Sequence, residues 1–120
     1  EINGAMPDYV SSRLIDLAKP APGSYLAILG VAYKSGISDI RESPAEDVAR
    51  SLQNQGFKVL WSDPLVKSFH DYQKLTDQNL AGAIVVTAQE GLAVAEIAKS
   101  GVPILDCTGA YKAVKGVEQL

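Results

Sequence analysis

The fold is decided by residues 25–46, which read YLAILGVAYKSGISDIRESPAE. The first part, Tyr25–Val31, is almost continuously apolar, which predicts a strand buried on both faces of a parallel sheet. The later Ser43-Pro44-Ala45-Glu46 segment combines a capping-box pattern with a proline at the first helical position, which predicts a helix start. We therefore expect a strand, a loop and a helix in this order.

The loop between the predicted strand and helix carries two cations, Lys34 and Arg41, seven positions apart. Cations placed between a strand end and a helix start are well placed to hold an anion such as phosphate. The alternative is a solvated loop in which they pair with Asp39 or Glu42. Such exposed ion pairs contribute only about 0–1 kcal/mol, so the sequence pattern leaves both interpretations open.

Strand and helix patterns alternate along the rest of the chain. A proline- and glycine-rich linker at 19–23 separates a first helix from the first strand, and Gly56 is expected to end the second helix. Residues 65–80 are polar and weakly periodic, and we predict one or two short helices there. The other predicted helices are 7–18, 44–55 and 90–100, and the predicted strands are 25–31, 58–62, 83–87 and 102–106.

This alternation predicts an α/β fold, a Rossmann-like doubly wound parallel sheet with helices on both faces, preceded by an N-terminal helix. Ligands of such folds bind beyond the carboxyl ends of the strands. Four loops should therefore converge on one edge of the sheet, namely 33–41, 63–64, 88–89 and 107–109. Five residues separate Gly30 from Gly36, so the first loop matches neither the dinucleotide fingerprint nor the P-loop.

The composition of the chain limits the classes of protein to which it can belong. The 120 residues suffice for one domain, 47% are hydrophobic, and the net charge of −3 argues against a general nucleic-acid surface. The apolar runs are shorter than a membrane span, and no signal-peptide pattern is present. The single cysteine, Cys107, cannot form an internal disulfide, which fits a reducing, cytoplasmic compartment. Glu1 is not a natural start, so we expect the chain to be part of a longer protein.

The run from Gly30 to Ala45 resembles the start of the C-terminal domain of the UDP-glucose/GDP-mannose dehydrogenase family. There, G-x-A-F/Y-K and a short spacer precede D-x-R-E-S-P-A. Residues 2–10 are similar to the N-x-x-M-P-x-Y-V stretch that follows the family's catalytic cysteine motif, and residues 106–109 align with its late D-x-R-N/G segment. The resemblance implies that residues 1–20 end the central linking helix region and that residues 21–120 form the nucleotide-sugar-binding C-terminal domain.

The same resemblance implies the roles of individual residues. Tyr33 and Lys34 would contact the nucleotide sugar, and Arg41 would contact NAD held by the N-terminal domain. Thr108 stands where relatives have an arginine that reaches the substrate, so this chain lacks that cation at the substrate contact. Cys107 lies outside any G-x-C-F-P-K-D-like motif. The resemblance therefore assigns no catalytic residue to this chain, and we expect no metal site.

By resemblance, the parent protein oxidises a UDP-sugar at C6 to the uronic acid, with two molecules of NAD and a cysteine thiolate as nucleophile. The chain would be inert alone. Its partners would be the UDP-sugar and the N-terminal NAD-binding and central domains of a homodimeric or larger enzyme of polysaccharide biosynthesis, with no nucleic acid or membrane involved. The Ser43-Pro44-Ala45 and Met6-Pro7 motifs look more like the UDP-N-acetylmannosamine dehydrogenase branch than the UDP-glucose branch.

Two other classes of protein were considered. A free-standing, non-catalytic nucleotide-binding or regulatory module remains the alternative. A receiver-like signalling domain needs an acidic cluster at the first strand end and a phosphorylatable aspartate at the third. Lys34 and Thr87 occupy those ends here, which argues against a receiver.

Other conspicuous residues are interpreted structurally. Asp63 follows the second strand, where Rossmann domains often bind a ribose hydroxyl, but Asp-Pro is a turn initiator and we favour that role. We expect His70 to be a solvated loop residue and Trp61 to lie in the core. Ser43 and Glu46 are assigned to helix capping.

Overall fold

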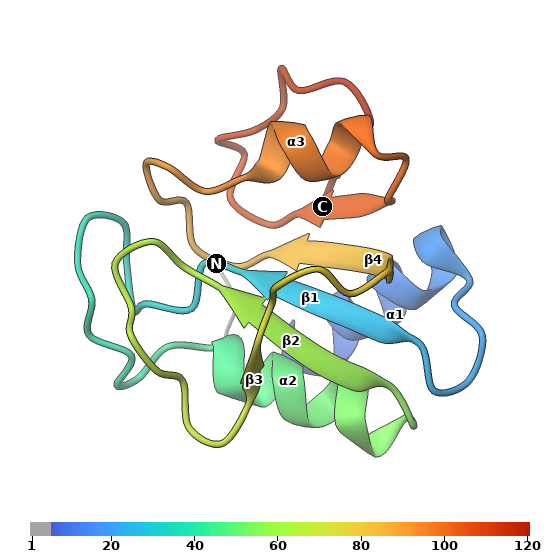
Figure 1. The fold of residues 1–120 in the computed structure, drawn as a ribbon, viewed down its shortest axis with the longest axis horizontal. Coiled ribbons are helices and arrows are strands. Elements are labelled where there is room, and N and C mark those ends of the chain that lie inside the picture. The colour runs from blue at the N-terminus through green and yellow to red at the C-terminus, as the bar shows by residue number, and fades with distance from the viewer. Residues whose placement is uncertain (1–5) are drawn as a thin grey trace.

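The computed structural model describes residues 6–120; residues 2–5 of the predicted linking motif lie outside the described part. Within residues 6–120, three helices and six strands follow one another along the chain (Figure 1). The helices are α1 (Met6–Ala18), α2 (Ala45–Asn54) and α3 (Val94–Lys99), and the strands are β1 (Tyr25–Leu29), β2 (Lys58–Ser62), β3 (Gln73–Lys74), β4 (Leu80–Val85), β5 (Ile104–Asp106) and β6 (Val117–Gln119).

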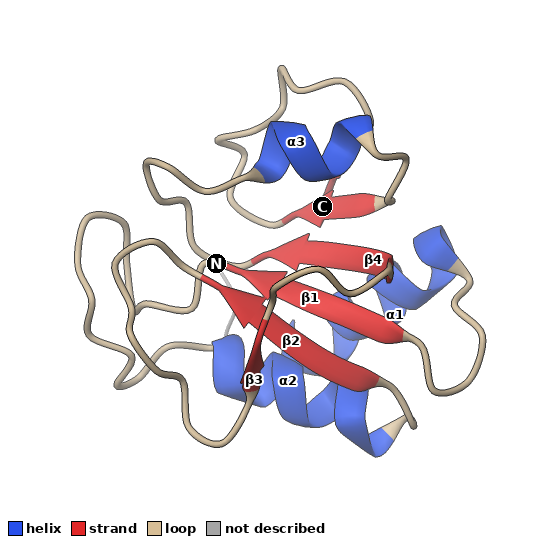
Figure 2. Ribbon diagram, in the orientation of Figure 1, coloured by secondary structure: helices blue, strands red, loops and turns tan. Residues whose placement is uncertain are grey.

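The six strands form one parallel sheet in the order β3-β2-β1-β4-β5-β6 (Figure 2). This is the Rossmann order, so the predicted fold class is confirmed. At the centre of the sheet, Ile28 of β1 is in register with Trp61 of β2 and Ile84 of β4. The chain runs outward from β1 to β3 on one side and from β4 to β6 on the other. The topological switch point therefore lies between β1 and β4.

Helices cover both faces of the sheet, as the apolar run of β1 requires. In Figure 1, α1 and α2 lie behind the strands, and Leu14 and Leu52 from these helices are fully buried in the same core cluster as Ile28. The alternate residues of β1 face the opposite layer, where Leu29 packs with Val94 of α3. Each face of a strand buried on both sides needs apolar residues, which explains why the strand pattern is continuous rather than alternating.

The prediction of short helices in residues 65–80 is wrong. This segment consists of turns and the edge strand β3, which pairs with Leu60 and Trp61 of β2. Its buried anchor is Phe69, whose ring packs edge-on against Trp61 with centroids 6.0 Å apart. The Trp61 indole also donates to the Tyr72 carbonyl at 3.0 Å. These contacts hold the segment against the strand, and they confirm Trp61 as a core residue.

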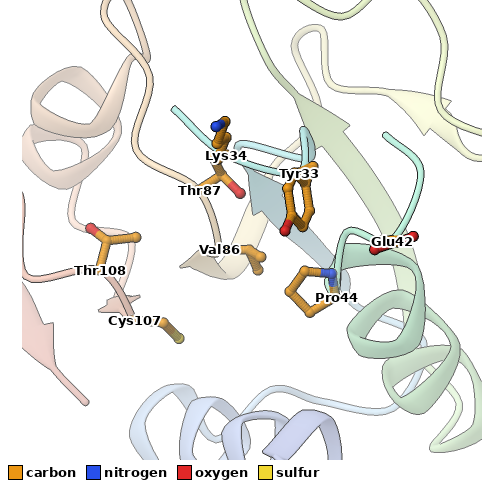
Figure 3. Close-up of a pocket in the computed structure, with 8 residues that line it drawn as sticks. All are labelled: Tyr33, Lys34, Glu42, Pro44, Val86, Thr87, Cys107 and Thr108. Atoms are coloured by element: carbon orange, nitrogen blue, oxygen red, sulfur yellow. The ribbon is translucent and has the colours of Figure 1, made fainter. Parts of the chain in front are cut away.

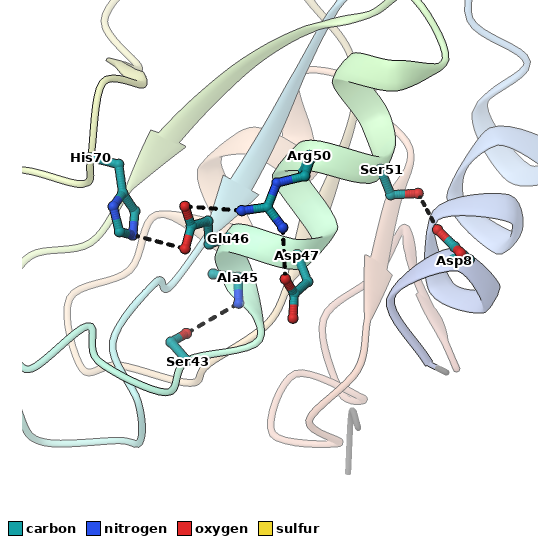
Figure 4. A network of polar contacts seen from close by, with 8 residues as sticks. All are labelled: Asp8, Ser43, Ala45, Glu46, Asp47, Arg50, Ser51 and His70. Atoms are coloured by element: carbon teal, nitrogen blue, oxygen red, sulfur yellow. Dashed lines mark hydrogen bonds and ion pairs between the residues drawn. The ribbon is translucent and has the colours of Figure 1, made fainter. Parts of the chain in front are cut away.

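The start of α2 differs in detail from the predicted capping box. Pro44 is the N-cap residue and Ala45 the first helical residue. The Ser43 hydroxyl accepts a hydrogen bond from the Ala45 amide at 3.2 Å, but Glu46 pairs with Arg50 at 3.2 Å instead of returning to Ser43 (Figure 4). The predicted contact from Glu46 back to Ser43 is therefore wrong, because the Glu46 carboxylate instead pairs with Arg50 one turn further along the helix. The helix ends before Gly56, as predicted.

Two of the predicted strands end two residues earlier than expected, β1 at Leu29 and β4 at Val85. The chain leaves the end of β1 at Gly30. This glycine has φ +79°, and a Cβ on it would lie 1.8 Å from the Thr87 carbonyl oxygen. The backbones that follow β1 and β4 therefore touch at the switch point. Helix α3 also begins later than predicted, at Val94, because the preceding residues form turns in which the Leu92 amide donates to the Gln89 carbonyl.

The N-terminal helix α1 is joined to the domain by side chains as well as by its core residues. The Ser51 hydroxyl of α2 donates to the Asp8 carboxylate at 2.8 Å (Figure 4). On the other side of α1, Arg13 reaches the Gln119 carbonyl of β6 at 3.5 Å. None of the helices formed by residues 6–120 is long and apolar enough to cross a bilayer.

Candidate functional site

A cavity of about 580 Å³ opens at the switch point, beyond the carboxyl ends of β1 and β4 (Figure 3). It is lined by Tyr33, Lys34, Glu42, Pro44, Val86, Thr87, Cys107 and Thr108. Open α/β sheets bind their ligands at this position, and the volume is in the range of small-molecule sites. We refer to it as the main cavity.

The buried carboxylate of Asp63 shapes the loop that borders the main cavity. Its Oδ2 accepts hydrogen bonds from the amides of Val31 at 2.9 Å and Ala32 at 3.2 Å. Its Oδ1 accepts from the Leu65 amide at 2.9 Å, which confirms the predicted turn role. The residue is 2% exposed, so this carboxylate is used inside the protein and is not presented to a ribose hydroxyl.

Gln89 completes this support, and the sequence analysis assigned it no role. Its Nε2 donates to the Ile37 carbonyl at 2.9 Å, and its Oε1 accepts from the Gly36 amide at 2.7 Å. Nε2 also lies 3.3 Å from both carboxylate oxygens of Asp63. The sequence offered one indication of this role, because Gln89 lies in the loop 88–89, which was predicted to converge with three other loops on one edge of the sheet. A buried glutamine there fixes the path of the 33–41 loop.

Tyr33 and Lys34 extend from this fixed loop to the main cavity. The Tyr33 amide donates to the Asp39 carbonyl at 2.7 Å and closes the loop, while its side chain is 51% exposed beside Pro44 (Figure 3). Lys34 is exposed and lines the same cavity beside Thr87. No carboxylate of residues 6–120 forms an ion pair with Lys34. Its charge is therefore available to an anionic ligand.

Thr108 reaches the main cavity from the opposite side, on the loop after β5. Its amide and hydroxyl both donate to Asp106 Oδ1, at 2.8 and 2.7 Å. Burial is the largest single influence on Asp106 and raises its pKa, but hydrogen bonds from Thr108, Tyr111 and Gln119 together bring the pKa below its usual value. The carboxylate thus orients Thr108, whose hydroxyl proton is already engaged.

Cys107 also borders the main cavity, next to Thr108. Burial, and to a smaller extent the neighbouring Asp106 charge, raise the pKa of its thiol from 9.0 to about 12. A nucleophilic cysteine works as the thiolate and has a lowered pKa. Cys107 is thus a neutral thiol at neutral pH, which suits a wall of the cavity rather than a nucleophile.

Arg41 lies away from the main cavity. Its Nη2 lies 2.7 Å from Asp39 Oδ2, and its Nε donates to the same carboxylate. These hydrogen bonds lower the pKa of Asp39 to about 2 and raise that of Arg41. Arg41 thus forms the surface pair that the sequence left open, whereas Lys34 does not. It lines a second, smaller cavity of about 340 Å³ with Tyr33, Asp39 and Glu42.

The only histidine lies outside both cavities. His70 is a loop residue with a side chain 39% exposed, as predicted, and its Nε2 lies 3.4 Å from the Glu46 carboxylate (Figure 4). Across residues 6–120, no group of three or more histidine, cysteine or acidic side chains is arranged to hold a metal ion. The structure thus brings Tyr33, Lys34 and Thr108 together around one cavity and places Arg41 beside a neighbouring one.

The strand order and the cavity at the switch point define a Rossmann-like α/β domain with its candidate ligand site at the switch point. Residues 27–113 match the family model described as "UDP-glucose/GDP-mannose dehydrogenase family, UDP binding domain". The chain belongs to this family, which confirms the resemblance inferred from the sequence motifs.

Curated relatives agree with this assignment. The chain is 35% identical over 86 residues to the UDP-N-acetyl-D-mannosamine dehydrogenase of Methanocaldococcus jannaschii, a match that covers 72% of the chain and 20% of the relative. It is 32% identical over 98 residues to the NDP-N-acetyl-D-galactosaminuronic acid dehydrogenase of Ralstonia solanacearum, covering 81% and 22%. The chain therefore spans about a fifth of the length of these relatives.

Solved structures share the fold. The UDP-N-acetyl-mannosamine dehydrogenase of Staphylococcus aureus aligns with a TM-score of 0.70 and 24% identity, covering 96% of this chain and 30% of that one. The UDP-glucose dehydrogenase of Pyrobaculum islandicum aligns with a TM-score of 0.69 and 23% identity, covering 93% and 28%. At these identities the likeness establishes the fold alone.

Proposed function

We propose that this chain is the nucleotide-sugar-binding domain of an NAD-dependent UDP-sugar 6-dehydrogenase that oxidises a UDP-sugar to its uronic acid. The observation that carries the proposal is the main cavity at the switch point, which Tyr33, Lys34 and Thr108 line together. Within residues 6–120, Lys34 has no ion-pair partner. Relatives of this chain have printed names of nucleotide-sugar dehydrogenases. The domain boundary at residue 20 and the ligand contacts of Tyr33, Lys34 and Thr108 belong to this proposal.

The chemistry of the main cavity suits a nucleotide diphosphate sugar. Lys34 provides a flexible cation for a phosphate oxygen, and hydrogen bonds to charged groups are stronger than neutral ones. Tyr33, Pro44 and Val86 provide apolar surface for a base or a sugar ring. Thr108 lacks the charge of the family arginine, so Lys34 is the one basic residue among the described residues that line the main cavity.

The residues of this chain do not fit a complete NAD site. The glycine fingerprint is absent, and the Asp63 carboxylate that would hold a ribose is buried and bonded to the Val31 and Ala32 amides. We therefore place NAD, which accepts the hydride, mainly on the N-terminal domain of the parent enzyme, with Arg41 reaching it across the domain boundary. The nucleophilic thiol is placed elsewhere in the parent as well, because Cys107 is a neutral thiol.

The biological setting follows from the same proposal. The names of several relatives favour the UDP-N-acetylmannosamine dehydrogenase branch. The parent enzyme would combine this chain with N-terminal and central domains, form a homodimer or larger assembly, and act in the cytoplasm in polysaccharide biosynthesis. Alone, the 120-residue chain is expected to form no NADH from any UDP-sugar.

Steady-state kinetics of the parent enzyme test the proposal. Loss of a hydrogen bond to a charged phosphate weakens binding by about 1.5–3 kcal/mol, so Lys34→Ala should raise the Michaelis constant for the UDP-sugar about ten-fold or more. The Michaelis constant for NAD should hardly change. Lys99→Ala, at the exposed end of α3, is the control. An unchanged value for the UDP-sugar in Lys34→Ala would remove Lys34 from the site.

A further inference from the structure

Glu42 occupies a backbone position that normally takes glycine. Its φ is +62°, in the left-handed region that L-residues avoid. It is the third residue of a turn closed by the Ser43 amide, which donates to the Ile40 carbonyl at 3.2 Å. Turns of this kind with positive φ at the third position favour glycine or asparagine. The turn itself therefore gives no reason for a glutamate.

The Glu42 side chain is not used to hold the fold together. It is exposed, and no hydrogen bond or ion pair to another side chain within residues 6–120 engages its carboxylate. It nevertheless lines both the main cavity and the smaller cavity that contains Arg41. Tyr33 is the other residue that lines both cavities, so Tyr33 and Glu42 form a wall that the two cavities share. Figure 3 shows their side chains on the Pro44 side of the main cavity.

The charged residues around the main cavity favour one orientation of a bound ligand. Arg41, the cation of the smaller cavity, forms its ion pair with Asp39, so no ion pair within residues 6–120 compensates the charge of Glu42 beside the main cavity. A ligand that carries phosphates is attracted by Lys34 and repelled by Glu42. It must therefore place its phosphates toward Lys34 and its neutral part toward Glu42. A carboxylate is a pure acceptor, and hydroxyl groups are the donors of a nucleotide sugar.

We infer that Glu42 is a ligand-contacting residue whose carboxylate accepts a hydrogen bond from a sugar hydroxyl in the main cavity. The inference rests on the proposed function, and it adds a determinant of polyol recognition to the anion site at Lys34. Residues held in strained backbone conformations cluster at ligand clamps. Glu42 keeps this strained conformation, although its side chain forms no hydrogen bond or ion pair within residues 6–120. The hydroxyl belongs either to the ribose or to the hexose of the ligand.

Calorimetric titration of the 120-residue chain with UDP and with UDP-glucose tests this inference. Glu42→Gly should weaken binding by about ten-fold through loss of the charged hydrogen bond. Glu42→Gln keeps an acceptor and should lose less. Because glycine suits the positive φ, Glu42→Gly should unfold at the same temperature as the wild type or at a higher one. The combination of retained stability and weaker binding is the signature of a ligand contact.

Matched controls separate this effect from general ones. Lys19→Gly replaces another exposed residue with positive φ, +48°, at a place outside both cavities. Glu96→Gln removes an exposed acidic charge from α3. Both should leave the affinities for UDP and UDP-glucose unchanged.

The results distinguish the ribose from the hexose as the source of the hydroxyl. Equal weakening of UDP and UDP-glucose supports the inference with the ribose as donor, and weakening of UDP-glucose alone supports it with the hexose. Normal binding by both Glu42 variants overturns the inference and leaves the proposed function intact. Failure of the wild-type chain to bind either ligand overturns both. Loss of thermal stability in Glu42→Gly with unchanged binding would show that the role of Glu42 is structural.

Discussion

The side-chain amide of Gln89 donates to the carboxylate of Asp63, with Nε2 3.3 Å from each oxygen. This contact joins the loop after β4 to the end of β2. Since Asp63 also holds the Val31 and Ala32 amides, the two side chains together fix the loop that carries Tyr33 and Lys34. Preorganised loops bind ligands with a smaller entropic cost.

Gln89→Ala should loosen this loop. The variant leaves the buried Asp63 carboxylate with fewer donors and the Gly36 amide without its acceptor, which should lower the free energy of unfolding by about 1–3 kcal/mol. Urea denaturation measures the loss, and hydrogen exchange should become faster at the Gly36 amide. Gln53→Ala, an exposed glutamine of α2, is the control and should have little effect. Equal behaviour of the two variants would contradict the role assigned to Gln89.

Gly30→Ala should disrupt the switch point. A Cβ at Gly30 would lie 1.8 Å from the Thr87 carbonyl oxygen, a backbone atom that cannot move aside cheaply. We expect a loss of more than about 3 kcal/mol in unfolding free energy. Gly36 has a similar φ of +86° with open space around it, so Gly36→Ala should cost only about 1–2 kcal/mol. Comparable losses in both variants would show that conformational strain alone decides the effect.

Arg41→Ala should affect the cofactor rather than the fold. The guanidinium is exposed and bonded only to the exposed Asp39 among residues 6–120, so the variant chain should unfold at nearly the wild-type temperature. In the parent enzyme, the same change should chiefly raise the concentration of NAD that is needed. If the chain loses several degrees while the NAD kinetics stay the same, Arg41 is a structural residue.

Cys107 should be unreactive and should make stability depend on pH in alkaline solution. With a pKa near 12 instead of 9.0, the thiolate at neutral pH is about a thousand-fold scarcer than for a free thiol, and alkylation should be slower by a similar factor. The raised pKa stabilises the folded state below pH 9, and this contribution is lost as pH rises through about 12. Cys107→Ala should weaken the alkaline loss of stability. Rapid alkylation of the folded chain at neutral pH would contradict this description.

Local patterns predicted most of the regular elements. The apolar run of β1, the β-branched residues of β4 and the stripe of α2 each report burial directly, so Tyr25–Leu29 and Ala45–Asn54 appear close to their expected positions. The family motif at residues 30–45 pointed to the edge of the sheet where the main cavity lies. There the predicted site residues Tyr33, Lys34 and Thr108 line one cavity.

The remaining features depend on contacts between distant segments. β3 has two residues, and its strand conformation comes from pairing with Leu60 and Trp61 rather than from its own sequence. Gln89 meets Asp63 across 26 positions, and no local pattern encodes such a contact. The choice of Asp39 rather than Glu42 as the partner of Arg41 depends on the shape of the turn.

The central claim is that Lys34 binds the phosphates of a nucleotide in the main cavity. Calorimetric titration of the 120-residue chain with UDP and with uridine tests it most directly, with Lys34→Ala and the control Lys99→Ala. The account predicts that Lys34→Ala weakens UDP binding about ten-fold or more while uridine binding is unchanged, and that Lys99→Ala behaves like the wild type. The same affinity for UDP in the wild type and in Lys34→Ala would contradict the account.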